Sequence, residues 1–236
     1  IQSSVVSLEI KVDKDDEGNP TGTLDIYMTN IPACSYCMDS QYTVKSQCEA
    51  VGMAPGSSSG GTADWIVDKN MTKSQCAAMG VNGSNNDIGT WFDGNVGGFQ
   101  FQLKGITVTG ASGGEAENMG FNVVTSQSTY NENTDTELPS VLGFSMTGAT
   151  IPSGEDQLLT TVTFTDFQDE SICFGTENSC NMASANAISD SNANCIDAEW
   201  GDCYCPESNP PDECGECGGS GVQQECGCGE LGLLDQ

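Results

Sequence analysis

Residues 96–114 read VGGFQFQLKGITVTGASGG, and their pattern is the clearest structural signal in the chain. The first half alternates large apolar residues, Phe99, Phe101 and Leu103, with glutamine. Successive side chains of a β-strand point to opposite faces, so this alternation predicts a strand with one buried face. A second alternating run follows Gly105 and ends in a glycine-rich segment typical of a turn. The stretch therefore predicts two consecutive short β-strands.

The same alternation recurs along the rest of the chain. Segments rich in Gly, Asn, Asp and Pro, which interrupt strands, separate the runs. At least six short strands joined by turns predict an all-β fold, arranged as an antiparallel β-sandwich. The further runs are Val6–Val12, Leu24–Met28, Ile106–Val108, Phe121–Val123, Leu142–Met146 and Val162–Phe164.

The charge composition argues against several classes of function. Six Lys, no Arg and 34 acidic residues give a net charge of −28, and the chain has no His. A surface this acidic does not neutralise phosphate, so we expect neither nucleic acid nor an anionic membrane as partner. Without His the chain also lacks the commonest general base and zinc ligand, and we predict that it is not an enzyme.

The cysteine content predicts an extracellular protein. Thirteen Cys stand at irregular spacings, and no apolar run is long enough to span a bilayer. Disulfides formed in an oxidising compartment are the preferred interpretation, and zinc ribbons are the alternative. We expect Cys173 and Cys180 to pair locally, and an odd Cys to remain in the tail. The other eleven are Cys34, Cys37, Cys48 and Cys76, then Cys195, Cys203, Cys205, Cys214, Cys217, Cys226 and Cys228.

The composition divides the chain into a sandwich domain, residues 1–195, and a tail, residues 196–236, that is rich in Cys and poor in apolar residues. Within the sandwich, residues 31–96 form a disulfide-rich insertion. The sequence KSQCEAVGM at 45–53 recurs there as KSQCAAMGV at 73–81, an offset of 28 (73 − 45), and each copy predicts a short helix.

Two interpretations of this repeat remain open. The insertion could present a recognition surface that carries Trp65 and Trp91. Alternatively, it is a small knot closed by disulfides, with the two Trp side chains as its core. The second interpretation is preferred, because so short a segment needs every apolar side chain it has for stability.

Three segments resemble a known group of domains: GTLDIYMTN, VGGFQFQLKGITVTGASGG and VLGFSMTGATIPSGEDQLLTTVTF. They are similar to the cohesin-like or carbohydrate-binding-module-like sandwiches of secreted bacterial and algal surface proteins. The resemblance covers residues 5–30 and 97–200 and implies a jelly-roll or cohesin-like sandwich. Such domains serve as adhesion, scaffolding or glycan-binding modules, and the resemblance identifies no binding residue.

The tail carries a second resemblance. DECGECGGSG at 212–221 resembles the DECGVCGG repeats that follow such domains in large extracellular proteins of aquatic microbes. LLDQ at 233–236 stands where that repeat would read LDECG. We therefore expect the natural chain to continue, with a further Cys that pairs with the odd one.

Two acidic segments have the spacing of calcium ligands. We expect the protein to require no cofactor, and calcium is the one ion that the sequence suggests. Carboxylate and amide oxygens at alternate positions around a turn suit Ca²⁺. The first segment lacks Glu at its twelfth position, where Leu24 stands, and solvated acidic loops are the alternative. The candidate ligands are Asp13, Asp15 and Glu17 in the first segment and Asp190, Asn192 and Asn194 in the second, with Asp197 and Glu199 beyond.

Three positions match patterns for N-glycosylation: Asn70 and Asn82 in the insertion, and Asn178 in the rarer N-x-C form. Export would expose these sites to the modifying enzymes, and sugar on the insertion would shield its apolar residues.

These observations favour a structural subunit of an extracellular filament, sheath or adhesin whose partners are copies of itself. In one variant, residues 3–12 would add as a strand to a neighbour's sheet. The main alternative is a carbohydrate-binding module, in which Trp65, Trp91, Tyr36 and Tyr42 would form an aromatic platform for sugar rings. A glycoside hydrolase is the least supported alternative, because 34 acidic residues make any chosen carboxylate pair uninformative.

Overall fold

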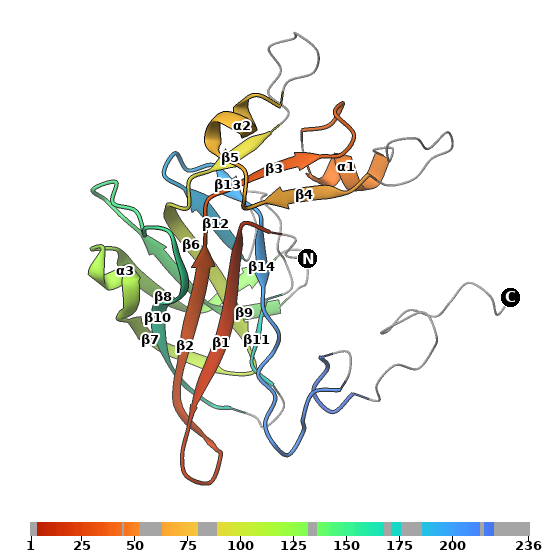
Figure 1. The fold of residues 1–236 in the computed structure, drawn as a ribbon. Coiled ribbons are helices and arrows are strands. Elements are labelled where there is room, and N and C mark those ends of the chain that lie inside the picture. The colour runs from red at the N-terminus through yellow and green to blue at the C-terminus, as the bar shows by residue number, and fades with distance from the viewer. Residues whose placement is uncertain are drawn as a thin grey trace, which may run out of the picture.

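The computed structural model describes residues 4–43, 45–51, 63–79, 89–131, 136–167, 171–175, 186–212 and 215–219. Two β-sheets pack against each other, and a third, smaller sheet projects from one end of them (Figure 1). The all-β, sandwich-like fold and its disulfides agree with the prediction. No described helix is long and apolar enough to cross a membrane.

The first sheet has five strands in the order β14-β1-β2-β10-β7. Its neighbours are antiparallel except β14 and β1, which run parallel. The strands are β1 (Val6–Lys14), β2 (Pro20–Asn30), β7 (Thr107–Ser112), β10 (Gly154–Thr165) and β14 (Ala198–Trp200).

The second sheet is built around the phenylalanine-rich strand β6. Its order is β13-β12-β6-β9-β8, and β11 pairs with the far end of β6. The strands are β6 (Val96–Lys104), β8 (Asn122–Asn131), β9 (Thr136–Phe144), β11 (Cys173–Phe174), β12 (Ala187–Asp190) and β13 (Cys195–Ile196).

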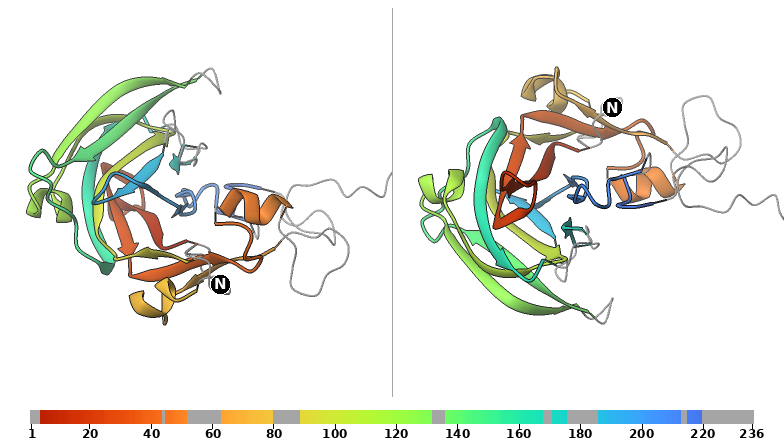
Figure 2. Two further views of the ribbon diagram at one scale, coloured as in Figure 1. Left: turned by 90° about the horizontal axis from the view of Figure 1, so that it is seen from above. Right: turned by 90° about the horizontal axis from the view of Figure 1, so that it is seen from below.

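The third sheet belongs to the insertion and has the order β4-β3-β5. Figure 2 shows it beside the sandwich, with the helices of the insertion next to it. Helix α3 lies apart from the insertion and contacts β10. The elements are β3 (Ala33–Cys37), α1 (Lys45–Val51), β4 (Trp65–Asp68), α2 (Lys73–Ala77), β5 (Thr90–Phe92) and α3 (Gly114–Asn118).

The alternating residues form the core between the two large sheets. Phe101 and Leu103 are fully buried, as are Leu24 and Ile26 from the facing sheet. Burying side chains of this size stabilises the fold by about 1.5–3 kcal/mol each. The ring of Phe174 on β11 meets that of Phe101 edge-on at 5.8 Å between centroids.

Strand β1 is paired on both sides within its own chain. It is antiparallel to β2 over its whole length and parallel to β14 at Val6–Leu8. At Val6–Leu8 the structure thus differs from the variant in which residues 3–12 pair with a neighbour's sheet, because β14 occupies that part of the β1 edge. Residues 198–200, which the sequence division placed in the tail, supply that strand.

The first residues of the tail are bonded to the sandwich. Cys173 forms a disulfide with Cys203 rather than with Cys180, so the prediction of a local pair is wrong. The amide and carbonyl groups of Ile172 and Tyr204 exchange hydrogen bonds at 3.0 and 2.8 Å beside this disulfide. Backbone pairing brings Cys173 to a cysteine 30 residues away in sequence, and the alternation pattern carries no information about that pairing.

Candidate functional site

The insertion contains the KSQC repeat, the four aromatic residues of the predicted sugar platform and two of the three predicted glycosylation sites. Strand β3 lies at its centre, with β4 antiparallel on one side and β5 antiparallel on the other. Each copy of the KSQC repeat forms a helix, α1 or α2, and the next strand along the chain is β4 or β5. The two repeats therefore build two helix-and-strand units around one shared strand.

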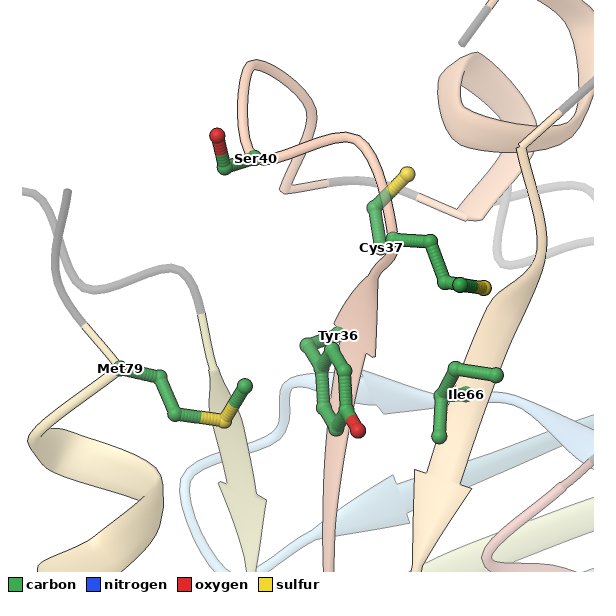
Figure 3. A pocket seen from close by; sticks show the side chains of 6 residues that line it. Tyr36, Cys37, Ser40, Ile66 and Met79 are labelled. Atoms are coloured by element: carbon green, nitrogen blue, oxygen red, sulfur yellow. The ribbon is translucent and has the colours of Figure 1, made fainter. Parts of the chain in front are cut away.

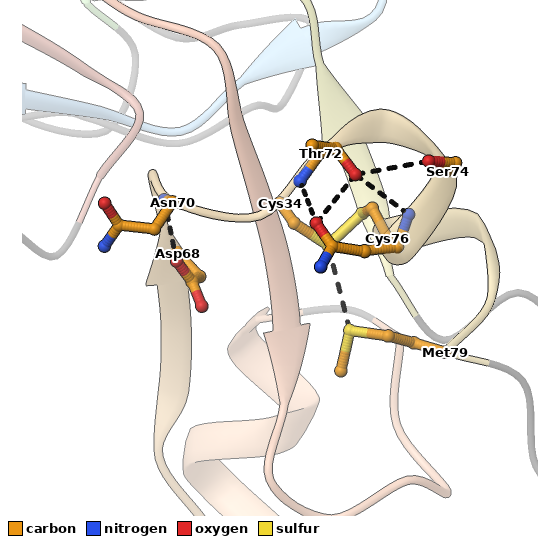
Figure 4. The surroundings of a disulfide bond; sticks show 8 residues. Cys34, Asp68, Asn70, Thr72, Ser74, Cys76 and Met79 are labelled. Carbon is orange, nitrogen blue, oxygen red and sulfur yellow. Dashed lines mark hydrogen bonds between the residues drawn. A yellow bond between two sulfur atoms is a disulfide. The ribbon is translucent and has the colours of Figure 1, made fainter.

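The disulfides attach each helix to a different face of β3. Cys34 and Cys37 lie three positions apart on the strand, so their side chains point to opposite faces. Cys34 bonds to Cys76 of α2, and Cys37 bonds to Cys48 of α1. Figure 4 shows the first of these bonds and the helix that it anchors. All four sulfur-bearing residues are buried.

The two tryptophans follow the same arrangement. Trp91 on β5 is the cross-strand partner of Cys34, and Trp65 on β4 is the partner of Cys37. Directly opposed residues share a face of a sheet. Each face of the insertion therefore combines one tryptophan, one disulfide and one repeat helix, which makes the two halves approximately symmetric about β3.

This arrangement separates the four aromatic residues proposed as a sugar platform. Trp65 and Tyr42 pack against the cluster that contains the Cys37–Cys48 disulfide. Tyr36 pairs with Ile66 and lies on the opposite face, which is also the face of Trp91. The structure therefore does not bring the four rings together as one flat platform.

A pocket of about 370 Å³ opens on the insertion beside Tyr36 (Figure 3). Its lining is mostly apolar, with hydroxyl groups only from Tyr36 and Ser40. Sugar recognition relies on several directed polar groups, whereas this lining suits a small apolar group. Sequence reasoning missed the pocket because it is assembled from β3, the turn after β3, β4 and the end of the second repeat. The lining residues are Tyr36, Cys37, Met38, Ser40, Ile66 and Met79.

The first predicted calcium segment forms the hairpin turn between β1 and β2. The amides of Glu17 and Asn19 donate hydrogen bonds to Asp15 Oδ1 at 2.9 and 2.8 Å. These bonds, with that of Asn19 foremost, lower the pKa of the Asp15 carboxyl group. Asp13 instead accepts a hydrogen bond from Thr23 on the neighbouring strand.

The second segment repeats this turn between β12 and β13. Partial burial raises the pKa of Asp190, but hydrogen bonds from Asn194 and Asn192 outweigh this effect, and the pKa is lowered. Asp197 forms an ion pair with Lys45 of α1. No group of three acidic or cysteine side chains among the described residues is placed to hold a metal ion. Both acidic segments thus form hairpin turns, in which backbone amides donate hydrogen bonds to the carboxylates of Asp15 and Asp190.

One predicted glycosylation site lies in the described chain. Asn70 is exposed in the turn before α2, and its amide donates to Asp68 at 2.8 Å (Figure 4). The hydroxyl residue of the sequon, Thr72, is also the N-cap of α2, in a capping box with Gln75. Asn82 and Asn178 lie outside the described residues.

The structure gives four disulfides between described residues: Cys34–Cys76, Cys37–Cys48, Cys173–Cys203 and Cys205–Cys217. Cys195 is also disulfide-bonded. The remaining cysteines, Cys180, Cys214, Cys226 and Cys228, lie outside the described residues, so the predicted odd cysteine stays a prediction.

Comparison of the chain with protein-family models, with curated proteins and with solved structures finds no match. The likeness to cohesin-like sandwiches and to DECGVCGG repeats therefore stays a prediction, and the functional argument depends on the geometry of this chain.

Proposed function

We propose that this protein is a structural subunit of an extracellular assembly such as a filament, sheath or adhesin. The observation that carries the proposal is that hydrogen bonds tie the disulfide-bonded insertion to the sandwich, and a disulfide ties the sandwich to the tail. Disulfides of this number are typical of oxidising compartments outside the cytosol. A subunit that bears load needs its parts fixed relative to one another, and each junction in this chain has such a tie.

The junction between the sandwich and the insertion centres on Asn30, the last residue of β2. Its side chain is fully buried and donates hydrogen bonds to the carbonyl groups of Gly94 and Pro152 at 2.6 and 3.0 Å. Gln157 donates to its Oδ1 in return. These bonds join three parts of the chain: the end of β2, the segment that returns from the insertion, and the loop before β10.

A second tie joins α1 to the edge of the sandwich. Asp197, between β13 and β14, accepts hydrogen bonds from Lys45 and from Ser4. Together with the Cys173–Cys203 disulfide, this contact fixes both the insertion and the start of the tail against β1 and β11. An assembly subunit with three such connected parts would transmit force through covalent and hydrogen-bonded links.

The carbohydrate-binding alternative receives less support from the geometry, because its aromatic residues divide between two faces. A glycan array with wild-type protein and Trp91→Ala would separate the two functions. Binding lost in the variant would favour the carbohydrate-binding module.

The test of the proposal is direct observation of native material. Electron microscopy of the protein from its source should show regular polymers that contain this chain, under native salt and calcium. Native material in which electron microscopy finds no polymers that contain this chain would overturn the proposal.

A further inference from the structure

The outer face of the second sheet differs in character from the rest of this acidic molecule. Four of its large apolar residues are exposed: Val124 by 48%, Leu142 by 37%, Phe144 by 36% and Met146 by 83%. Monomeric proteins expose single apolar residues routinely, but neighbouring ones mark an interaction surface.

The strand register places these residues together. Val124 is the cross-strand partner of Leu142, and Phe144 is two positions further along β9 on the same face. Met146 is the second residue after the end of β9. The apolar residues thus form one continuous area over β8 and β9.

Two rows of described residues on this face carry no charge across four strands. These rows of partners cross it from β8 through β9 and β6 to β12. We call these residues, with Met146, the neutral face. The first row is Asn122, Phe144, Gly98 and Ser189, and the second is Val124, Leu142, Gln100 and Ala187.

The outer face of the first sheet provides the contrast. Glu9 pairs there with Tyr27, and Lys11 pairs with Asp25. Lys11 also bonds to Asp156 at 2.9 Å and lies 4.0 Å from the centre of the Tyr27 ring. That face is charged, whereas the two rows of the neutral face are not.

We propose that the neutral face binds a second copy of this chain in a two-fold symmetric contact. Two molecules of net charge −28 repel each other, so they approach most easily where neither presents a carboxylate. A cationic partner would instead prefer the acidic faces. The absence of charge therefore selects a partner with the same kind of surface, which the protein itself supplies.

The shape of the face also suits self-association. The Phe144 ring stands beside Gly98, its cross-strand partner, which has no side chain. In a two-fold contact each copy presents the same patch, so Phe144 of one copy can lie over Gly98 of the other. Face-to-face sheets pack about 10 Å apart, which one layer of such side chains fills.

This inference deepens the proposed function by naming one subunit contact, and a two-fold contact alone gives a closed pair. The nine residues of the neutral face are fewer than the 20–30 on each side of a standard interface, so we expect a dissociation constant in the micromolar range. A polymer would need a further contact elsewhere on the subunit.

The test compares two double variants by sedimentation at increasing protein concentration in 0.15 M NaCl. Val124→Glu with Met146→Glu adds two carboxylates at the two most exposed large apolar residues of the neutral face. Thr109→Glu with Ser112→Glu adds the same charge to exposed positions of β7 in the first sheet and is the matched control. Circular dichroism and thermal unfolding establish that each variant is folded.

We expect the wild-type protein and the control to dimerise equally. The dissociation constant of the neutral-face variant should rise at least about tenfold, because like charges would oppose each other across the contact. Raising the salt to 1 M should strengthen wild-type dimerisation, since screening weakens the remaining repulsion. A folded neutral-face variant that dimerises as well as the wild type overturns the inference, and so does a monomeric wild type.

The failures of the two proposals are distinguishable. Wild-type pairs that the neutral-face substitutions break, without polymers in native material, would support the contact and overturn the structural role. Polymers that form equally well from the neutral-face variant would support the structural role and overturn the contact.

Discussion

Cys34 and Cys37 lie on one strand but face opposite sides of it, because an odd separation along a β-strand reverses the direction of the side chain. This relationship explains why the insertion has two copies of the KSQC helix. Each face of β3 offers one cysteine, and each helix closes one face with its own cysteine. A sheet of three short strands buries little apolar surface by itself, so its stability depends on the two disulfide-bonded helices.

The two disulfides should differ in their contribution to stability. Cys34–Cys76 closes a separation of 42 residues and Cys37–Cys48 one of 11. The loop-entropy model gives about 4 kcal/mol for the longer loop and about 3 kcal/mol for the shorter. Replacing each pair by two alanines should therefore lower the free energy of unfolding more for the first pair, as measured by denaturant unfolding.

Each double variant serves as the control for the other, because all four cysteines are buried and the packing loss is similar. If the Cys37 and Cys48 variant is the less stable of the two, loop closure is not what these bonds mainly contribute.

A glycine next to the first disulfide should be intolerant of substitution. A Cβ atom at Gly89 would lie 2.8 Å from Cys76 Sγ and 2.9 Å from Cys34 Sγ. Gly89→Ala should therefore displace the disulfide or strand β5, at a cost of about 1–3 kcal/mol. Thermal unfolding, with free thiols counted by alkylation and mass spectrometry, checks this.

The matched control is Gly110→Ala, whose Cβ would meet only the Thr163 hydroxyl at 3.1 Å. This side chain can rotate, so the melting temperature should change little. Equal melting temperatures for the wild type, Gly89→Ala and Gly110→Ala would show that the sulfur atoms yield without cost.

The sequence pattern predicts the strands of the large sheets, but it does not predict which distant segments pair with one another. The period-two alternation around Phe99 and Phe101 reports the burial of single strands, and those strands form. Pairing between distant strands leaves no such local signal, so the sequence favours the nearby Cys180 over Cys203 as the partner of Cys173. The KSQC repeat was visible, but its arrangement about β3 depends on strand register.

The acidic segments show a different limit of sequence reasoning. A calcium loop and a tight hairpin both place carboxylates and amides at short spacings around a turn. In the segments that begin at Asp15 and Asp190, backbone amides bond to the carboxylate and complete the turn. The residue types alone do not distinguish an ion from an amide as the partner.

The hairpin carboxylates predict a specific dependence of stability on pH. The pKa of Asp190 is lowered from its ordinary value of 3.8, so its ionised form favours the folded state. This stabilisation is fully present above the unfolded pKa and is lost as the pH falls through the folded pKa. Asp190→Asn should therefore lower the melting temperature at pH 7, and the difference from wild type should shrink below pH of about 3.8.

Asp16→Asn is the control for this experiment, because it removes one negative charge from an exposed position in the β1–β2 turn. Its melting temperature should equal or exceed that of the wild type at pH 7, since the molecule carries excess negative charge. A difference for Asp190→Asn that persists unchanged at pH 2 would exclude the carboxylate as the cause.

The turn before α2 allows glycosylation and helix capping to be tested separately. Asn70 is exposed and carries the potential sugar, whereas Thr72 both completes the sequon and caps α2. In a eukaryotic secretory host, Asn70→Gln should remove one glycan mass and leave the deglycosylated protein as stable as the wild type. Thr72→Ala should remove the same mass and also cost about 1 kcal/mol, because the first turn of α2 loses its cap.

Thr72→Ser completes this series, since serine retains both the sequon and a capping hydroxyl. The glycan mass that it carries should match that of the wild type, and its stability should be nearly unchanged. Intact-protein mass spectrometry and thermal unfolding after enzymatic deglycosylation measure the two effects independently. A wild-type mass without glycan at this site would contradict the glycosylation prediction alone, because the capping cost of Thr72→Ala would remain measurable.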